Sequence, residues 1–256
     1  MRKIMGRMAV CAAALALSAC GGPAVLPLPT NDVSNVPRPS PVVRIPSSDF
    51  DRTPTAAAKG FAGVIRQMEP IVERECVRRR TTPINCDYQF VVDDRAGLEP
   101  NAFQTVGKDG RPIIGFTLSL IGEARNADEL AFVVGHEASH HILGHLDRKS
   151  SAAMAGSVIL GGLASAYGAS EDAIRSAQDA GAQMVARYYS CDWELEADYL
   201  GAIIALDAGF DPAHGAQFFA RIPDPGDRIL GSHPSTASRM AQVARAVRDY
   251  QSGAFY

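Results

Sequence analysis

The spacing of apolar residues along the chain predicts helices in some segments and strands in others. Residues 56–80 carry apolar side chains at helical intervals, which predicts a core-facing helix with a kink or break at Pro70. The stretches "DYQFVVDD" and "RPIIGFTLSLI", residues 87–94 and 111–121, are rich in β-forming residues and bounded by turn residues. We expect these two stretches to be paired strands.

Three further segments predict helices in the second half of the chain. Asn126 is followed three residues later by Glu129, a capping-box pattern that opens a helix over about 127–146. Apolar spacing predicts another helix over about 191–208 and a last one over about 235–250. The expected fold class is therefore α+β, mainly α, with a small β-sheet packed on the helix that follows Asn126.

Residues 150–170 contain no charged side chain, which raises the question of a membrane span. Most of these residues are Ala, Gly and Ser, which are too weakly apolar to favour insertion into a bilayer. Small residues do allow two helices to approach closely. We therefore expect a closely packed helical hairpin here, and a membrane segment is the alternative.

The first nineteen residues have the features of an export signal. A basic start and a short apolar core precede the tetrad Leu17-Ser18-Ala19-Cys20. The tetrad resembles the signal of bacterial lipoproteins, which implies that Cys20 is acylated. In that class, Gly21 in place of Asp implies the periplasmic side of the outer membrane. An ordinary secretory signal with an incidental cysteine is the alternative.

The chain is expected to divide into a lipoprotein signal peptide over 1–19, a proline-rich tether over 20–54 and one domain over 55–256. It has 25 basic and 28 acidic residues, and three of the basic ones lie in the signal. The remaining balance of about −6 argues against a nucleic-acid surface. The expected membrane contact is made through the lipid anchor.

Two cysteines, Cys76 and Cys86, bracket a short polar loop in the domain. Because the expected compartment is oxidising, a disulfide between them is the favoured pairing among the three that Cys76, Cys86 and Cys191 allow. Two buried thiols are the alternative. The spacing does not fit a zinc ribbon.

The stretch "GHEASHHILGH", residues 135–145, contains four of the six histidines in the chain. On a helix, His136 and His140 lie about 40° apart on one face, so both imidazoles can reach one ion. This is the H-E-x-x-H spacing, in which two histidines bind zinc and the glutamate beside the first, here Glu137, acts as a general base.

The other residues of this stretch are not expected to bind the metal. His141 points about 100° away from His140, and His145 lies on the opposite face of a continuous helix, so both are expected to make packing, surface or supporting contacts. Leu143 and Leu146 stand where the longer metzincin motif requires Gly and His, which excludes that family. A catalytic zinc still needs a third protein ligand and an open position.

Candidates for the third ligand lie further along the chain: His214, His233 and the acidic run "CDWELEADYLG". Within that run Glu194 and Asp198 share one helical face, whereas Glu196 points the other way. One carboxylate of the pair could bind the metal while the other accepts the ring N–H of a ligand histidine. A simple solvated face is the alternative.

The histidine helix, the acidic run and the later "GSHPSTASRM" together resemble the zinc peptidases of the HtpX and prenyl-protein (CAAX) protease type, and most closely their small BepA-like periplasmic lipoproteins. The resemblance runs over roughly residues 56–250. It implies a zincin-like, gluzincin catalytic domain with one Zn²⁺ per chain, bound by His136, His140 and Glu194. His141 replaces a residue that is usually hydrophobic. The helical repeats of longer members are lacking, which leaves their adaptor partners open.

The expected activity is that of a zinc-dependent endopeptidase of the bacterial cell envelope, acting on unfolded or misassembled envelope proteins. Glu137 would take a proton from the attacking water and pass it to the leaving amine. The substrate would lie extended along an exposed strand edge, expected within 111–121, and "NAF" at 101–103 resembles the family's lead-in to that strand. The rival hypothesis is a non-proteolytic periplasmic chaperone or assembly factor with a structural zinc, for which His233 could supply a fourth ligand.

His233 matches the H-P motif that follows the third ligand in the resembled family. Three roles are open for it: a cap near Pro234, a catalytic group that stabilises the oxyanion, or a displaceable ligand that keeps the site closed. Gly226 and Gly231 favour the third role, because glycines allow a loop to move.

Overall fold

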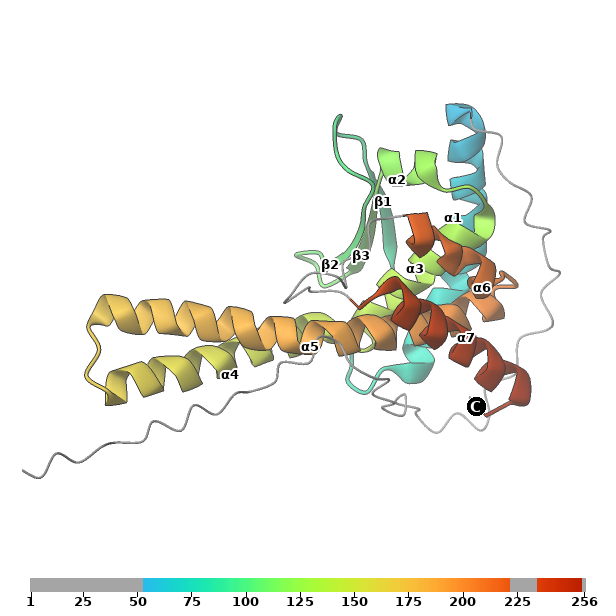
Figure 1. The fold of residues 1–256 in the computed structure, drawn as a ribbon. Coiled ribbons are helices and arrows are strands. Elements are labelled where there is room, and N and C mark those ends of the chain that lie inside the picture. Colours follow the sequence, from blue (N-terminus) through green and yellow to red (C-terminus); the bar gives the residue numbers. More distant parts are fainter. Residues whose placement is uncertain (1–52, 222–233, 255–256) are drawn as a thin grey trace, which may run out of the picture.

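The computed structural model describes residues 53–221 and 234–254 (Figure 1). In chain order its elements are α1 (Pro54–Arg79), β1 (Gln89–Asp93), β2 (Ala102–Val106), β3 (Pro112–Thr117), α2 (Leu118–Glu123), α3 (Ala127–Ile142), α4 (His145–Ala166), α5 (Glu171–Asp207), α6 (Pro212–Gly215), the 3-10 helix η1 (Ala216–Arg221) and α7 (Thr236–Ser252). Helices dominate over one small sheet, which confirms the α+β, mainly α class. The expected signal peptide, nearly all of the tether and Cys20 lie outside the described residues.

The first helix, α1, continues through Pro70, so the expected break is wrong. Buried side chains lie on both sides of the proline, with Met68 before it and Ile71 and Val72 after it. These side chains pack into the main core, and that packing holds the helix together where Pro70 cannot donate a backbone hydrogen bond. Thr53 caps the N-terminus by accepting a hydrogen bond from the Ala56 amide.

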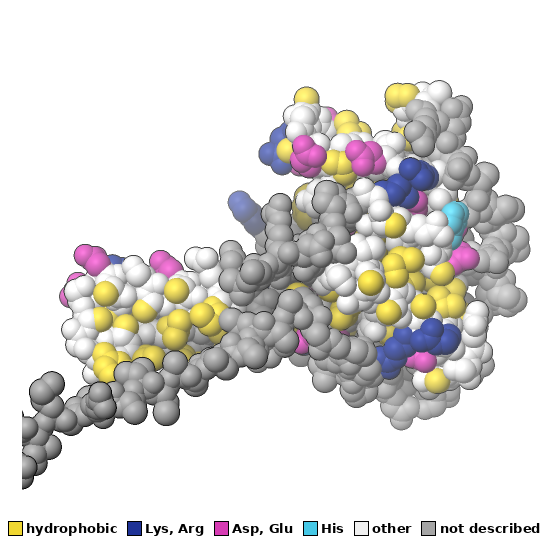
Figure 2. Space-filling model, in the orientation of Figure 1, with side chains coloured by type: hydrophobic (Ala, Val, Ile, Leu, Met, Phe, Trp, Pro, Cys, Tyr) yellow, Lys and Arg dark blue, Asp and Glu magenta, His cyan; other side chains and the backbone are white. Residues whose placement is uncertain are grey.

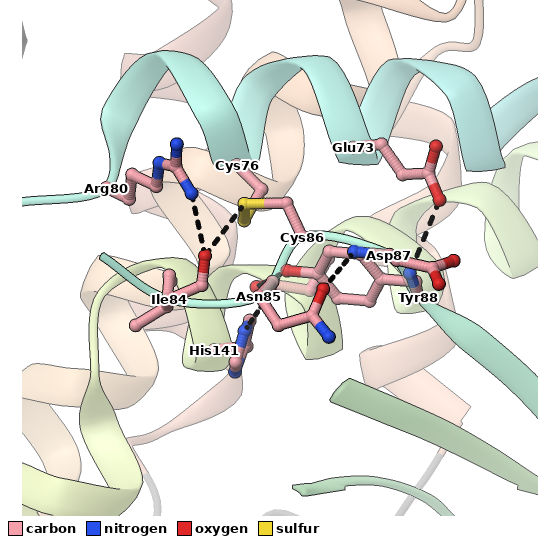
Figure 3. The surroundings of a disulfide bond; sticks show 10 residues. Glu73, Cys76, Arg80, Ile84, Asn85, Cys86, Asp87, Tyr88 and His141 are labelled. Carbon is pink, nitrogen blue, oxygen red and sulfur yellow. Dashed lines mark hydrogen bonds between the residues drawn. A yellow bond between two sulfur atoms is a disulfide. The ribbon is translucent and has the colours of Figure 1, made fainter. Parts of the chain in front are cut away.

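The loop after α1 is fixed by a disulfide between Cys76 and Cys86, the pair that the sequence favoured (Figure 3). Beside this bond, His141 of α3 contacts the carbonyl oxygen of Asn85 through its Nε2, at 2.8 Å. Tyr88 donates a hydrogen bond to a backbone carbonyl of α3. The cross-linked loop therefore joins the end of α1 to the helix that carries the histidines.

The sheet has the strand order β1-β3-β2, with β1 parallel and β2 antiparallel to β3. The two expected strands are β1 and β3, and they do pair. The second is shorter than expected, because Thr117 ends it and its hydroxyl accepts a hydrogen bond from the Leu120 amide at the start of α2. The sequence reading missed β2, which forms one edge of the sheet.

The histidine helix α3 ends at Ile142, not near residue 146 as expected. Gly144 has φ 66°, in the left-handed region that favours glycine, and α4 starts directly after it. The chain therefore changes direction before His145. Because of this turn, His145 does not lie on the opposite face of α3, where a continuous helix would place it.

A closely packed helical hairpin is present and projects from the rest of the domain (Figure 1), but residues 150–170 supply only one arm of it, in α4, and the turn. The expectation that this stretch forms the whole hairpin is wrong, because the second arm is the first half of α5, which carries charged residues. An added Cβ on Gly181 would lie 2.1 Å from the carbonyl oxygen of Gly156, so the two backbones touch. Figure 2 shows apolar side chains along the hairpin, and its exposed large ones are Met154, Val158, Ile159, Leu163, Tyr167 and Met184. In the part of the chain that the structure describes, no helix meets the length and hydropathy that a membrane span requires.

Candidate metal centre and active site

The crossing of α3 and α5 brings the histidine helix onto the acidic run. A Cβ on Gly135 would lie 2.6 Å from the carbonyl oxygen of Gly201, and a Cβ on Gly201 would lie 2.7 Å from the His136 amide nitrogen. Glycine at both positions lets the two backbones meet. The side chains of α3 next to this contact therefore face the acidic side chains of α5.

Three side chains at the crossing offer atoms to one metal ion. His136, His140 and Glu194 each present a donor atom, and these atoms lie within 4.8 Å of one another. The Nε2 atoms of the two histidines are 3.1 Å apart. The Glu194 carboxylate lies 3.4 Å from Nε2 of His136 and 3.5 Å from Nε2 of His140. The three residues named by the motif resemblance are thus brought together.

The hydrogen bonds around the two histidines show that this donor set fits a cation. Each ring engages its Nδ1 elsewhere: His136 with Asp198 at 2.9 Å, and His140 with His145 at 2.8 Å. Both Nε2 atoms are therefore free to point their lone pairs at the same place, next to Glu194. Two imidazoles and one carboxylate, with access to a cleft, are the ligands of a catalytic zinc site.

The charge balance of the site also fits a cation. Burial alone would lower the pKa of His136, but the carboxylates of Asp198 and Glu194 raise it to about 10. Burial and the neighbouring His136 lower the pKa of His140 to about 3. Without metal, the cluster thus keeps a positive charge on one of its rings. A bound cation takes over that role.

Asp198 is fixed by an arginine from the last helix. Arg239 of α7 donates from Nε to Oδ2 at 2.8 Å and from Nη2 to Oδ1 at 2.6 Å, and its guanidinium lies 3.5 Å from the ring centre of Phe219. Burial would raise the pKa of Asp198, but Arg239 and His136 lower it. The carboxylate therefore stays ionised and accepts the Nδ1–H of His136.

The sequence reading assigned no role to Arg239, although a signal was present. It lies on the buried face of α7 with Gln242, Val243 and Ala246, at helical spacing. An arginine within a buried helical face requires a carboxylate partner.

The other ligand histidine, His140, is supported by His145, for which a supporting contact was one of the expected roles. His145 is buried and lies beside His140, and its Nε2 is 3.1 Å from the Glu196 carboxylate. Arg148 donates to the same carboxylate at 2.6 Å. Glu196 does lie on a different face of α5 from Glu194, as expected, and the turn at Gly144 brings His145 and α4 onto that face.

The proposed base Glu137 follows His136 on α3 and lines a cleft of about 800 Å³. Burial raises the pKa of its carboxyl to about 7, and the positive charge of His136 opposes part of this rise. The cleft is also lined by residues of β2, α5 and η1. Glu137 and the three metal-binding side chains therefore face one common space.

The remaining described histidines, His141 and His214, lie outside this cluster. His141 contacts the Asn85 backbone, and His214 pairs with Asp128 at 2.9 Å, so neither joins the metal-binding group. Of the supporting, packing and surface contacts expected for His141, its position against the cross-linked loop fits a packing contact. His233 lies outside the described residues.

The sequence matches the family model of Peptidase family M48 over residues 65–247. The chain belongs to peptidase family M48. Comparison with curated proteins and with solved structures found no match. The M48 assignment confirms the zinc metallopeptidase family inferred from the motifs, and it makes the chain a zinc-dependent hydrolase with a zincin-like domain. The residues that could hold the metal ion are His136, His140 and Glu194.

Proposed function

We propose that this M48 peptidase is an endopeptidase of the bacterial cell envelope that cleaves unfolded or misassembled envelope proteins. The observation that carries the proposal is the open edge of β2, which lines the same cleft as the metal-binding triad and Glu137. A strand edge binds extended chains through their backbone, so it accepts many sequences but requires an unfolded segment.

The substrate edge is β2 rather than the expected stretch 111–121. β3 lies between β1 and β2 and is paired on both sides, so it has no edge to offer. Thr117 donates to the Asn101 carbonyl, and Gly107 donates to the Arg111 carbonyl. Because bonded positions alternate along an antiparallel ladder, the backbone groups of residues 102, 104 and 106 point away from β3. Among the described residues no backbone bond ends on these groups, so they can pair with a bound peptide.

The cleft also has room and apolar surface for substrate side chains. Phe132 and Val133 of α3 line it, together with Phe218 and Phe219 of η1 and Phe103 of β2. Phe103 lies across Gly115 of β3, where a side chain would collide with its ring. Large apolar side chains are mostly buried in folded proteins and become accessible on unfolding, which fits a role in quality control.

The chemistry follows from the placement of Glu137. Bound zinc supplies Lewis acidity, which polarises a carbonyl and lowers the pKa of water. Glu137 takes the proton of the attacking water at its carboxylate and delivers it to the nitrogen of the leaving amine. Asp198 and Arg239 hold His136 in its ligand orientation during these steps. A purely structural site would have no use for Glu137, which counts against the rival hypothesis of a non-proteolytic chaperone.

The envelope location rests on the sequence. The lipoprotein-like tetrad ending in Cys20 supports acylation and a position at the periplasmic side of the outer membrane. The disulfide between Cys76 and Cys86 suits an oxidising compartment. Replacing Cys20 by Ser should stop the incorporation of labelled fatty acid and release the protein from membranes, and membrane retention of this variant would contradict the lipid anchor.

The substrate class can be tested with one protein in two states. The zinc-loaded enzyme should cleave a reduced, unfolded protein and leave its native, disulfide-bonded form intact, and a chelator should stop the cleavage. Equal cleavage of the native form would contradict the requirement for an extended segment. Failure to cleave either form would favour the non-proteolytic alternative.

A further inference from the structure

We propose that His145, Glu196 and Arg148 form a hydrogen-bonded chain that holds His140 in the tautomer that binds zinc. His145 is then a positioning residue of the metal centre, acting through His140. The proposal concerns the metal centre described above. It rests on the proposed function only in assuming that the zinc bound there is catalytic.

The distances give one consistent assignment of the protons. Because Nε2 of His140 faces His136 and Glu194, its metal-binding lone pair is on Nε2 and its proton is on Nδ1. That proton is donated to Nδ1 of His145, 2.8 Å away. The proton of His145 is then on Nε2, which lies 3.1 Å from the Glu196 carboxylate. Each ring is neutral and each nitrogen has a partner.

The opposite assignment fails at the metal. If His145 carried its proton on Nδ1, His140 would have to accept at Nδ1 and carry its own proton on Nε2. A protonated Nε2 has no lone pair for zinc, and it would point at the Nε2 of His136 only 3.1 Å away. The carboxylate beside His145 therefore selects the tautomer of His140 two groups away.

Charge and packing fix Glu196 and His145, the far end of this hydrogen-bonded chain. Arg148 donates to both oxygens of Glu196, from Nη1 at 2.6 Å and from Nη2 at 3.4 Å. Trp193 stacks on the His145 ring with 6.1 Å between ring centres and 23° between planes. The guanidinium of Arg148 lies 5.4 Å from the centre of the same indole ring. These contacts restrict the ring of His145 to one orientation.

The two ligand histidines thus receive matched support by different routes. His136 donates directly to Asp198, which is bound by Arg239, whereas His140 reaches Glu196 and Arg148 through His145. In both cases an ionised carboxylate held by an arginine makes the ring a better ligand. The route through His145 exists because α3 ends at Ile142 and α4 returns the chain to the site.

Zinc affinity, measured by competition with a chromogenic chelator, tests the chain without peptide substrate. His145→Leu removes the acceptor and should weaken zinc binding roughly ten- to a hundredfold. His145→Asn keeps an acceptor oxygen near the place of Nδ1 and should recover most of that affinity. His141→Leu is the matched control and should bind zinc like the wild type, because the ring of His141 contacts the Asn85 carbonyl and Tyr88 rather than a metal-binding side chain.

Wild-type affinity in His145→Leu overturns the proposal. So does an equal loss in the Leu and Asn variants, which would mean that the position only fills space. If a variant fails to fold, the zinc-loaded wild type with ¹⁵N-labelled histidine decides the matter by long-range ¹⁵N–¹H correlation. The proposal requires a proton on Nδ1 of His140 and on Nε2 of His145, and the reverse pattern overturns it. Neither measurement involves cleavage. The proposed role of His145 can therefore be overturned while the proposed peptidase activity stands, and the peptidase activity can be overturned while the role of His145 stands.

Discussion

Nδ1 of His136 lies 2.9 Å from Oδ1 of Asp198, and the same oxygen receives a hydrogen bond from Arg239 at 2.6 Å. The three residues come from α3, α5 and α7, so three helices distant in sequence meet at one carboxylate. The orientation of a metal ligand therefore depends on the packing of the last helix. Variants far from the H-E-x-x-H motif should affect the metal.

Asp198→Asn should weaken zinc binding roughly ten- to a hundredfold, because the neutral amide no longer polarises His136. Dialysis against buffered zinc followed by metal analysis measures the change. Asp179→Asn is the control, since Asp179 is exposed on the same helix. Unchanged zinc affinity in the Asp198 variant would remove this carboxylate from the metal centre.

Arg239→Leu should lower the free energy of unfolding by about 1.5–3 kcal/mol, because it removes two charge-assisted hydrogen bonds from the buried Asp198 carboxylate and leaves His136 as its charged neighbour. Denaturant unfolding of the metal-free protein measures this loss. Arg248→Leu, on an exposed position of the same helix, should change the free energy by about 0.5 kcal/mol or less. Equal stability of the two variants would mean that Asp198 is not ionised in the folded protein.

Gln104→Pro should lower kcat/KM for an unfolded substrate roughly two- to tenfold, because it removes one outward N–H from the edge of β2, worth about 0.5–1.5 kcal/mol. The change spares the ladder with β3, since the amide of residue 104 points outward. Gln104→Ala keeps this N–H and should retain the wild-type value. If both variants cleave at the wild-type rate, the substrate does not pair with this edge.

Gly181→Leu should open the hairpin, because even a Cβ there would lie 2.1 Å from the carbonyl oxygen of Gly156. An overpacked contact costs about 1–3 kcal/mol, and amide hydrogen exchange in α4 and α5 should become faster. Gly162→Ala is the control on α4, where a Cβ meets nothing within 4 Å. That change should slow exchange, since alanine favours a helix by up to about 1 kcal/mol. Slow exchange in the Leu variant would contradict the close contact of α4 and α5.

The sequence predicted the parts of the site that depend on local spacing. His136, Glu137 and His140 lie within one helix, and Glu194 and Asp198 lie four residues apart on another, so helical periodicity was sufficient to group them. The third metal ligand, Glu194, was implied by the family resemblance, and the crossing of the two helices brings it to His136 and His140. The family match then agrees with the motif over most of the domain.

The parts that the sequence did not predict depend on the course of the chain. The role of His145 requires knowing that α3 stops before Gly144, and one glycine in an apolar run does not establish a helix end. β2 is short, and its exposed positions include the apolar Phe103 and Val106, so its sequence does not alternate between buried apolar and exposed polar residues. α5 begins at Glu171 rather than near 191. Its first half was not predicted, because it packs through small residues instead of an apolar stripe.

The most direct test of the central claim compares the wild type with Glu137→Gln in the same experiment. Zinc content per chain and the rate of hydrolysis of an unfolded protein are measured for both. The variant should keep zinc near one per chain and lose cleavage, because the amide keeps the shape of the side chain but cannot accept the proton. Cleavage at the wild-type rate by a fully zinc-loaded Glu137→Gln protein would contradict the assignment of Glu137 as the base of this metal centre.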